Sequence, residues 1–145
     1  MTLGETMRLI TWFFTCFLFG CAGQSEEQAY LRDFPDELRS FAGHSIDDAI
    51  ARHRRLIESA HTLEANGAFR EMNADRTIGY LALRLYALET AKGNAAAATR
   101  YKDESMRRLI AGEIIPGTWT SEKKEELWRR ELEQLFKMEN PQWRQ

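Results

Sequence analysis

Three histidines are the side chains of this chain best suited to metal binding or acid–base catalysis: His44, His53 and His61. His53 and His61 are eight residues apart, roughly 12 Å along a helix, which is too far to share a metal ion without a third element. No His-x-x-x-His pair, Gly-x-Ser-x-Gly motif or glycine-rich phosphate loop is present. We therefore expect no metal site, no cofactor and no catalytic residue. We expect a protein that is not an enzyme, with His53 partly buried and His61 exposed.

Three other side chains are candidates for binding a partner. Arg84 interrupts a stretch that is otherwise apolar on nearly all sides, and a buried arginine needs a counter-charge. It either reaches the surface with its stem on the core or anchors a carboxylate of a bound protein. Trp128 and Trp143 lie near the C-terminus beside charged residues, a setting typical of binding hot spots, although such rings also seal the end of a bundle.

The N-terminal region has the pattern of an export signal. Leu9–Phe19 is mostly apolar and follows a single basic residue, Arg8. It is too short to span a bilayer, which takes about 20 residues, but it suits the core of a signal peptide. Together, Leu18-Phe19-Gly20-Cys21 resembles the lipobox of bacterial lipoproteins, in which a small residue precedes the cysteine that is acylated. Phe19 departs from the small or β-branched residue usual at its position.

This resemblance implies that residues 1–20 are removed and that Cys21 becomes a lipid-modified N-terminus. Ala22 after the cysteine implies sorting to the outer membrane, on its periplasmic face. The alternatives are an uncleaved anchor helix, or a signal cut at a small-residue site without lipidation. Translation can begin at Met1 or at Met7.

Composition restricts the partners and the chemistry further. The formal net charge is −2, so there is no basic excess to hold a phosphate backbone, and we expect no nucleic acid partner. Cys16 falls within the leader and Cys21 would carry the lipid, which leaves no thiol for a disulfide. The hydrophobic content of 43% is sufficient for one packed domain after the leader is removed.

The rest of the chain divides into three parts. Residues 21–44 are rich in acidic side chains and contain Pro35, and we interpret them as a solvated acidic tether. Residues 45–140 show apolar side chains at three- and four-residue spacing, which predicts a helical domain. Residues 141–145 are expected to form a C-terminal tail.

Four helices are expected within 45–140. Their N-termini are predicted from capping residues, namely Ser45, Asn73, Asn94 and either Thr120 or Ser121. Their ends are predicted at Asn66-Gly67, Lys92-Gly93, Gly112 and Asn140-Pro141. The second of these helices is apolar around most of its circumference from Thr77 to Ala91 and is expected to be central.

The predicted fold class is therefore all-α, either a four-helix bundle or two stacked antiparallel helical hairpins. Leu85, Gly93-Asn94, Ala98 and Ser105 resemble the middle of a tetratricopeptide repeat, which implies an antiparallel helical hairpin. Tyr86 and Lys102 depart from that pattern, and no second copy appears at its period.

Together these features favour a non-catalytic, lipid-anchored periplasmic adaptor that binds another envelope protein. In size, anchor and helix count the chain is similar to pilotins, which escort secretin subunits to the outer membrane, and an immunity lipoprotein is a related possibility. The alternative is a carrier that holds an apolar ligand between its helices. An envelope hydrolase would require His53 or His61 beside an acidic residue in an open cleft.

Overall fold

The computed structural model describes residues 25–43 and 45–144, and these residues form helices joined by turns and short loops, with no strand among them. The predicted all-α class is confirmed. The helices are α2 (Glu26–Gly43), α3 (Ile46–Ala65), α4 (Ala74–Lys92), α5 (Ala95–Ala111) and α6 (Ser121–Glu139), followed by a short 3-10 turn, η1 (Gln142–Arg144).

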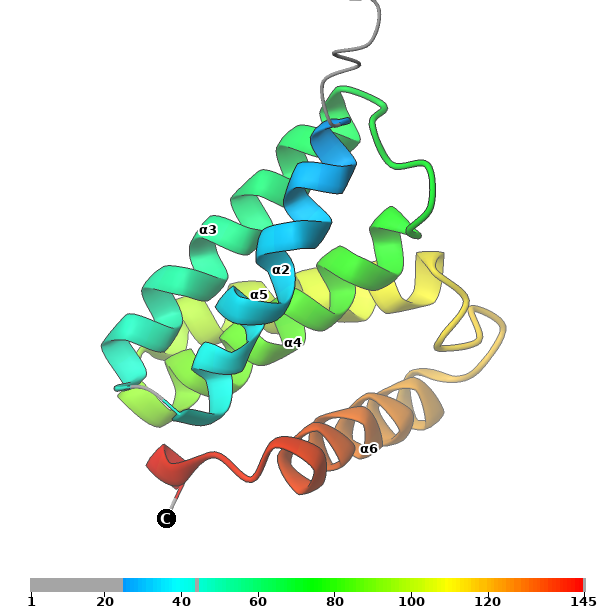
Figure 1. The fold of residues 1–145 in the computed structure, drawn as a ribbon. Helices are drawn as coiled ribbons and strands as arrows, with labels where there is room; N and C mark the ends of the chain where they lie inside the picture. Colours follow the sequence, from blue (N-terminus) through cyan, green and yellow to red (C-terminus); the bar gives the residue numbers. More distant parts are fainter. Residues whose placement is uncertain (1–24, 44, 145) are drawn as a thin grey trace, which may run out of the picture.

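The helices are arranged as two antiparallel hairpins (Figure 1). One hairpin consists of α2 and α3 and the other of α4 and α5, and α3 packs against α4. The helix α6 runs in the same general direction as α4 and is joined to it mainly by side chains. Of the two predicted arrangements, stacked hairpins describe this part of the chain.

The predicted tether is wrong for Glu26–Gly43, which forms α2 and belongs to the folded domain. Its apolar residues Tyr30 and Phe41 are buried, and burial of such side chains stabilises the helix more than its weak local propensity opposes it. Pro35 lies inside the helix and is exposed, so water can reach the backbone carbonyl that its missing N–H leaves free.

Glu27 fixes the first turn of α2 to the loop before α4. Its carboxylate, which is buried, accepts hydrogen bonds from the backbone N–H groups of Arg70, Glu71 and Met72 at 2.8 to 3.1 Å. The bond from Met72 is the main cause that lowers the pKa of Glu27, and burial opposes it. The acidic residue that suggested a solvated segment is therefore an internal contact.

The predicted helix starts are confirmed at four places. Ser45, Asn73, Asn94 and Thr120 each accept a hydrogen bond from the backbone N–H three residues later, which satisfies one otherwise free donor of the first turn. At the C-terminus of α4, Gly93 has φ +82°, a left-handed conformation that glycine adopts without steric cost.

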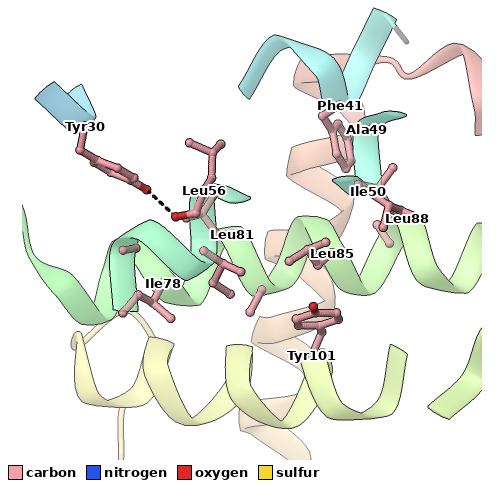
Figure 2. Close-up of a cluster of buried hydrophobic side chains, with 14 of the residues drawn as sticks. Tyr30, Phe41, Ala49, Ile50, Leu56, Ile78, Leu81, Leu85, Leu88 and Tyr101 are labelled. Carbon is pink, nitrogen blue, oxygen red and sulfur yellow. Dashed lines mark hydrogen bonds between the residues drawn. The ribbon is translucent and has the colours of Figure 1, made fainter. Parts of the chain in front are cut away.

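The helix α4 is central, as predicted. Its buried side chains face α3 and α2 on one side and α5 on another (Figure 2). Leu85 is fully buried. A Cβ placed on Gly79 would lie 2.8 Å from Leu109 Cδ2, so glycine at this position is what allows α4 and α5 to approach so closely. The residues buried along α4 are Ile78, Gly79, Leu81, Ala82, Leu83, Arg84, Leu85, Ala87, Leu88 and Glu89.

Several predictions concern residues outside the described ranges. These are the signal peptide at 1–20, the lipid-bearing Cys21 and His44. Within the described ranges, none of the helices has both the length and the apolar character needed to cross a membrane.

Candidate functional site: a groove between α2, α4 and α6

Trp128, a predicted partner-binding residue, is an internal packing residue. Its side chain is 1% exposed, its ring meets Tyr86 edge-on at 4.8 Å between centroids, and Lys102 Nζ lies 5.2 Å from its centre. Its indole Nε1 donates a hydrogen bond to Ser105 Oγ. The prediction of Trp128 as a binding residue is therefore wrong, because its buried ring packs α6 against α4 and α5 and is not available to a partner.

Trp143, the second predicted aromatic, closes the C-terminus against α2. Its Nε1 donates a hydrogen bond to the Phe41 carbonyl at 2.6 Å, and its ring packs edge-on against the rings of Phe41 and Phe136. Residues 142–144 form η1 and Pro141 is buried, so this part of the predicted tail is packed. Trp143 remains partly exposed, but both its indole N–H and much of its ring are engaged within the chain.

Arg84, the third predicted residue, is buried at 8% exposure and has an internal partner. Its Nη2 donates to Glu139 Oε1 at 2.7 Å, and its guanidinium carbon lies 4.9 Å from the centre of the Phe41 ring. Burial lowers the pKa of Arg84, and the carboxylate of Glu139 counteracts this effect. Arg84 Nη1 is buried without a hydrogen-bond partner, so this cation is only partly satisfied.

Arg84 lines a groove of about 440 Å³ between α2, α4 and α6, which we call the α2–α4–α6 groove. Phe34 and Leu38 of α2 form one wall and Leu135 of α6 forms the opposite wall, with Leu81 of α4 between them. The complete lining is Phe34, Leu38, Arg76, Thr77, Tyr80, Leu81, Arg84, Glu131, Gln134, Leu135 and Met138.

The rim of the groove exposes two large side chains. Met138 of α6 is 80% exposed and Tyr80 of α4 is 36% exposed. Tyr80 donates from its hydroxyl to Glu131 Oε2 at 2.9 Å. Burial, helped by this carboxylate, raises the pKa of Tyr80 to about 12. The Tyr80–Glu131 bond therefore joins α4 to α6 across the rim as a neutral phenol paired with a carboxylate.

One polar side chain of the groove, that of Arg76, is held by a backbone carbonyl. Arg76 lies two helical turns before Arg84 on α4, and its Nε donates to the Gly112 carbonyl at 2.7 Å. A Cβ on Gly112 would lie 2.8 Å from Arg76 Cγ, so glycine at 112 leaves room for this side chain. A concave, mainly apolar site with a few fixed polar groups is typical of sites for small ligands, including sites between helices.

A second hollow of about 590 Å³ lies between α2 and α3, and four of its eleven lining residues are acidic: Glu26, Asp33, Glu37 and Glu58. Three of its carboxylates have partners within the chain. Asp33 pairs with Arg32, Glu37 with Arg55, and Glu26 accepts from Asn66. We interpret this hollow as a solvated charged surface.

The histidines occupy two different environments. His53 is fully buried, its Nδ1 lies 2.9 Å from the Ala49 carbonyl, and its Nε2 has no partner. Burial, with a smaller effect of the Arg84 charge, lowers its pKa to about 4. His61 is partly exposed, and its Nε2 lies 2.9 Å from Glu104 Oε1. That contact joins α3 to α5, and neither residue lines the α2–α4–α6 groove.

Among the described residues, no three histidine, cysteine or acidic side chains lie close enough together to hold a metal ion. Comparison of the chain with protein-family models, with curated proteins and with solved structures found no match.

Of the three predicted partner-binding residues, Arg84 is the one that lines the groove. The other residues were missed because the groove forms only where three helices meet, and one of them, α2, was predicted as a tether. The signal that could have found it was the spacing of Tyr30, Phe34, Leu38 and Phe41, which places apolar side chains on one face of a helix.

Proposed function

We propose that this chain is a non-catalytic, lipid-anchored protein of the cell envelope that binds an apolar ligand in the α2–α4–α6 groove. The anchor part of the proposal depends on the lipobox-like Leu18-Phe19-Gly20-Cys21, with Cys21 acylated on the periplasmic face of the outer membrane. One observation carries the binding part. A groove of about 440 Å³ is lined by apolar side chains from three helices and has a buried, partly unsatisfied arginine in its wall.

The anchor is tested by labelling with palmitate. The wild-type chain should incorporate the label and should sediment with outer membranes, whereas Cys21→Ser should do neither. An unlabelled wild-type chain, or a mature N-terminus at another residue, would contradict the anchor without affecting the groove.

The ligand is tested by native mass spectrometry of the chain purified from envelopes. We expect a co-purifying apolar molecule that is absent from Leu135→Trp, because the larger ring fills the groove from the α6 side. Lys123→Trp is the matched control, since it adds the same ring at an exposed position outside the groove lining. A wild-type chain that carries no ligand and takes up no added apolar molecule would contradict the proposal.

The second candidate function is the adaptor, in which a segment of another envelope protein places its side chains in the same groove. The exposure of Met138 and Tyr80 at the rim favours it, because large apolar side chains rimmed by polar residues commonly mark docking sites. This candidate covers both the pilotin-like and the immunity-like versions.

The adaptor is tested by affinity purification from an envelope extract. It predicts one stoichiometric protein partner that is lost in Met138→Asp and kept in Lys123→Gln, which changes the net charge equally at an exposed site outside the groove. Recovery of a lone monomer under several growth conditions would count against it.

A further inference from the structure

Phe41 of α2 is the point at which five elements of the fold meet. Its ring packs edge to face against the rings of His53 on α3 and Trp143 of η1, with 5.9 and 5.2 Å between centroids. The guanidinium carbon of Arg84 on α4 lies 4.9 Å from the centre of the Phe41 ring, and the Phe136 ring of α6 lies 6.3 Å away. These five residues form what we name the Phe41 junction.

Two buried polar atoms of the Phe41 junction lack hydrogen-bond partners. They are His53 Nε2 and Arg84 Nη1. Two other buried nitrogen atoms without partners, Nε of Arg54 and Nε of Arg108, lie outside the junction. An atom that has lost its water without gaining a partner opposes burial. Ring packing therefore holds the junction together against an unfavourable polar contribution.

The hydrogen bonds of His53 determine where an added proton goes. Nδ1 lies 2.9 Å from the Ala49 carbonyl oxygen, which can only accept, so Nδ1 carries the proton of the neutral ring. Ser40 Oγ lies 3.2 Å from the same nitrogen and donates its own hydrogen to the Glu37 carbonyl at 2.6 Å. A second proton must therefore bind to Nε2, which has no acceptor in the closed junction.

The surroundings of His53 oppose this second proton. Burial is the main cause that lowers the pKa of His53, and the positive charge of Arg84 on α4 adds to the effect. Glu139 of α6 is hydrogen-bonded to Arg84, and Glu37 of α2 pairs with arginines of α3. The Phe41 junction itself contains no carboxylate. A protonated His53 therefore gains a partner for Nε2–H only when that atom reaches water.

The helix α2 has a separate attachment at each end. At its N-terminal end the Glu27 carboxylate accepts hydrogen bonds from the backbone N–H groups of residues 70–72. These bonds, that from Met72 foremost, lower the pKa of Glu27, so it stays ionised in mild acid. At its C-terminal end α2 is attached through Phe41. Pro35 lies between the two and has no N–H to bond the preceding turn, so one end can separate while the other stays attached.

The contacts among α3, α4 and α5 do not involve His53. Arg108 of α5 donates to Glu64 at the end of α3 and to Asp75 at the start of α4. The hydrogen bond from Arg108 is the main cause that lowers the pKa of Glu64, so this ion pair also persists in mild acid. Acid therefore acts on the Phe41 junction before it acts on this part of the domain.

We propose that protonation of His53 at Nε2 opens the Phe41 junction, so that the C-terminal end of α2 and η1 separate from α3 and α4 while Glu27 holds the N-terminal end of α2. The junction is thus an acid-sensitive latch within the fold. This inference depends neither on the lipid anchor nor on a ligand in the α2–α4–α6 groove.

The experiment is residue-resolved hydrogen exchange of the full-length chain at pH 7 and pH 4, corrected for the intrinsic exchange rates. Because the pKa of His53 falls from 6.5 to about 4 in the closed state, opening becomes more favourable as the pH drops below 6.5. Protection at residues 38–43 and at Trp143 Nε1 should therefore fall by about a hundredfold at pH 4. The amides of residues 70–72 and of α5 should keep their protection.

The matched variants are His53→Leu and His61→Leu. His53→Leu should abolish the acid-dependent loss at residues 38–43. His61→Leu removes a partly exposed histidine that contacts Glu104, and it should leave that loss in place. If His53→Leu does not fold, the ring ¹⁵N signals of the wild-type chain replace it: they should show the Nδ1–H tautomer of His53 at pH 7 and titrate with the midpoint of the exchange.

Three results overturn the inference. The first is unchanged protection at residues 38–43 in acid, and the second is a parallel loss in α2 and α5, which would make the acid effect global unfolding. The third is an acid-dependent loss that persists in His53→Leu or has a midpoint different from that of the His53 ring.

Discussion

Trp128 and Ser105 are joined by a buried hydrogen bond of 3.0 Å, in which the indole Nε1 donates to the serine hydroxyl oxygen. The same hydroxyl donates to the Gly79 carbonyl at 2.9 Å. One small side chain on α5 therefore holds the principal buried residue of α6 and contacts the backbone of α4.

Ser105→Ala should destabilise the domain by about 1–3 kcal/mol, because the indole N–H of Trp128 is then buried without an acceptor. The free energy of unfolding from urea denaturation, followed by circular dichroism, measures this loss. Ser121→Ala, at the exposed first residue of α6, is the control and should have little effect. Equal stabilities of Ser105→Ala and the wild-type chain would show that α6 does not depend on this bond.

Gly79→Ala should destabilise the domain although alanine favours helices by about 1 kcal/mol over glycine. The added Cβ would lie 2.8 Å from Leu109 Cδ2 and 3.2 Å from the Leu109 backbone nitrogen, so α4 and α5 must separate. Gly43→Ala is the matched control, because a Cβ there meets nothing within 4 Å. Melting temperatures should therefore fall for Gly79→Ala and stay level or rise for Gly43→Ala.

His53 should make the domain lose stability in mild acid. Its pKa is lowered from 6.5 to about 4 in the folded protein, so the folded state favours the neutral ring. The contribution is complete above about pH 6.5 and is lost as the pH falls toward 4, with a total of about 3 kcal/mol. Urea denaturation between pH 7 and pH 4 measures this slope.

The control separates His53 from the other titrating groups. His53→Leu should flatten the slope between pH 6.5 and pH 4, whereas His61→Ala should leave that part of the slope in place. A His53→Leu variant with the wild-type slope would show that another group causes the acid sensitivity.

Glu27→Gln should loosen α2, because an uncharged amide accepts hydrogen bonds from the backbone of Arg70, Glu71 and Met72 less strongly than a carboxylate does. Hydrogen exchange should accelerate at those three amides and along residues 26–43. Glu26→Gln, an exposed neighbour that contacts the Asn66 side chain, is the control. Unchanged exchange in Glu27→Gln would show that burial of Tyr30 and Phe41 alone holds α2 in place.

The predicted elements came from local signals. Ser45, Asn73 and Thr120 cap helices because a serine, asparagine or threonine side chain satisfies amides three residues away, whatever the rest of the fold does. The burial of α4 was likewise visible in its near-complete apolar circumference. These features depend on neighbours within one or two helical turns, which a sequence displays directly.

The missed elements depend on distant contacts. The helix α2 is held by amides more than 40 residues away through Glu27 and by the packing of Phe41 against Trp143, and neither contact is visible in the local pattern. The groove likewise needs α2, α4 and α6 together. The sequence identified Trp128 as notable but could not show whether it faced Ser105 or solvent.

In the proposed function, α2 is the helix that connects the anchor to the groove. Glu26 begins this helix five residues after Cys21, and Phe34 and Leu38 of the same helix form one wall of the groove. An acyl anchor on Cys21 would therefore transmit any mechanical tension from the bilayer into α2. Glu27 resists that tension, because its carboxylate is hydrogen-bonded to the loop before α4. A force that pulls Glu27 off its three amides would free the N-terminal end of the helix that supplies Phe34 and Leu38 to the groove.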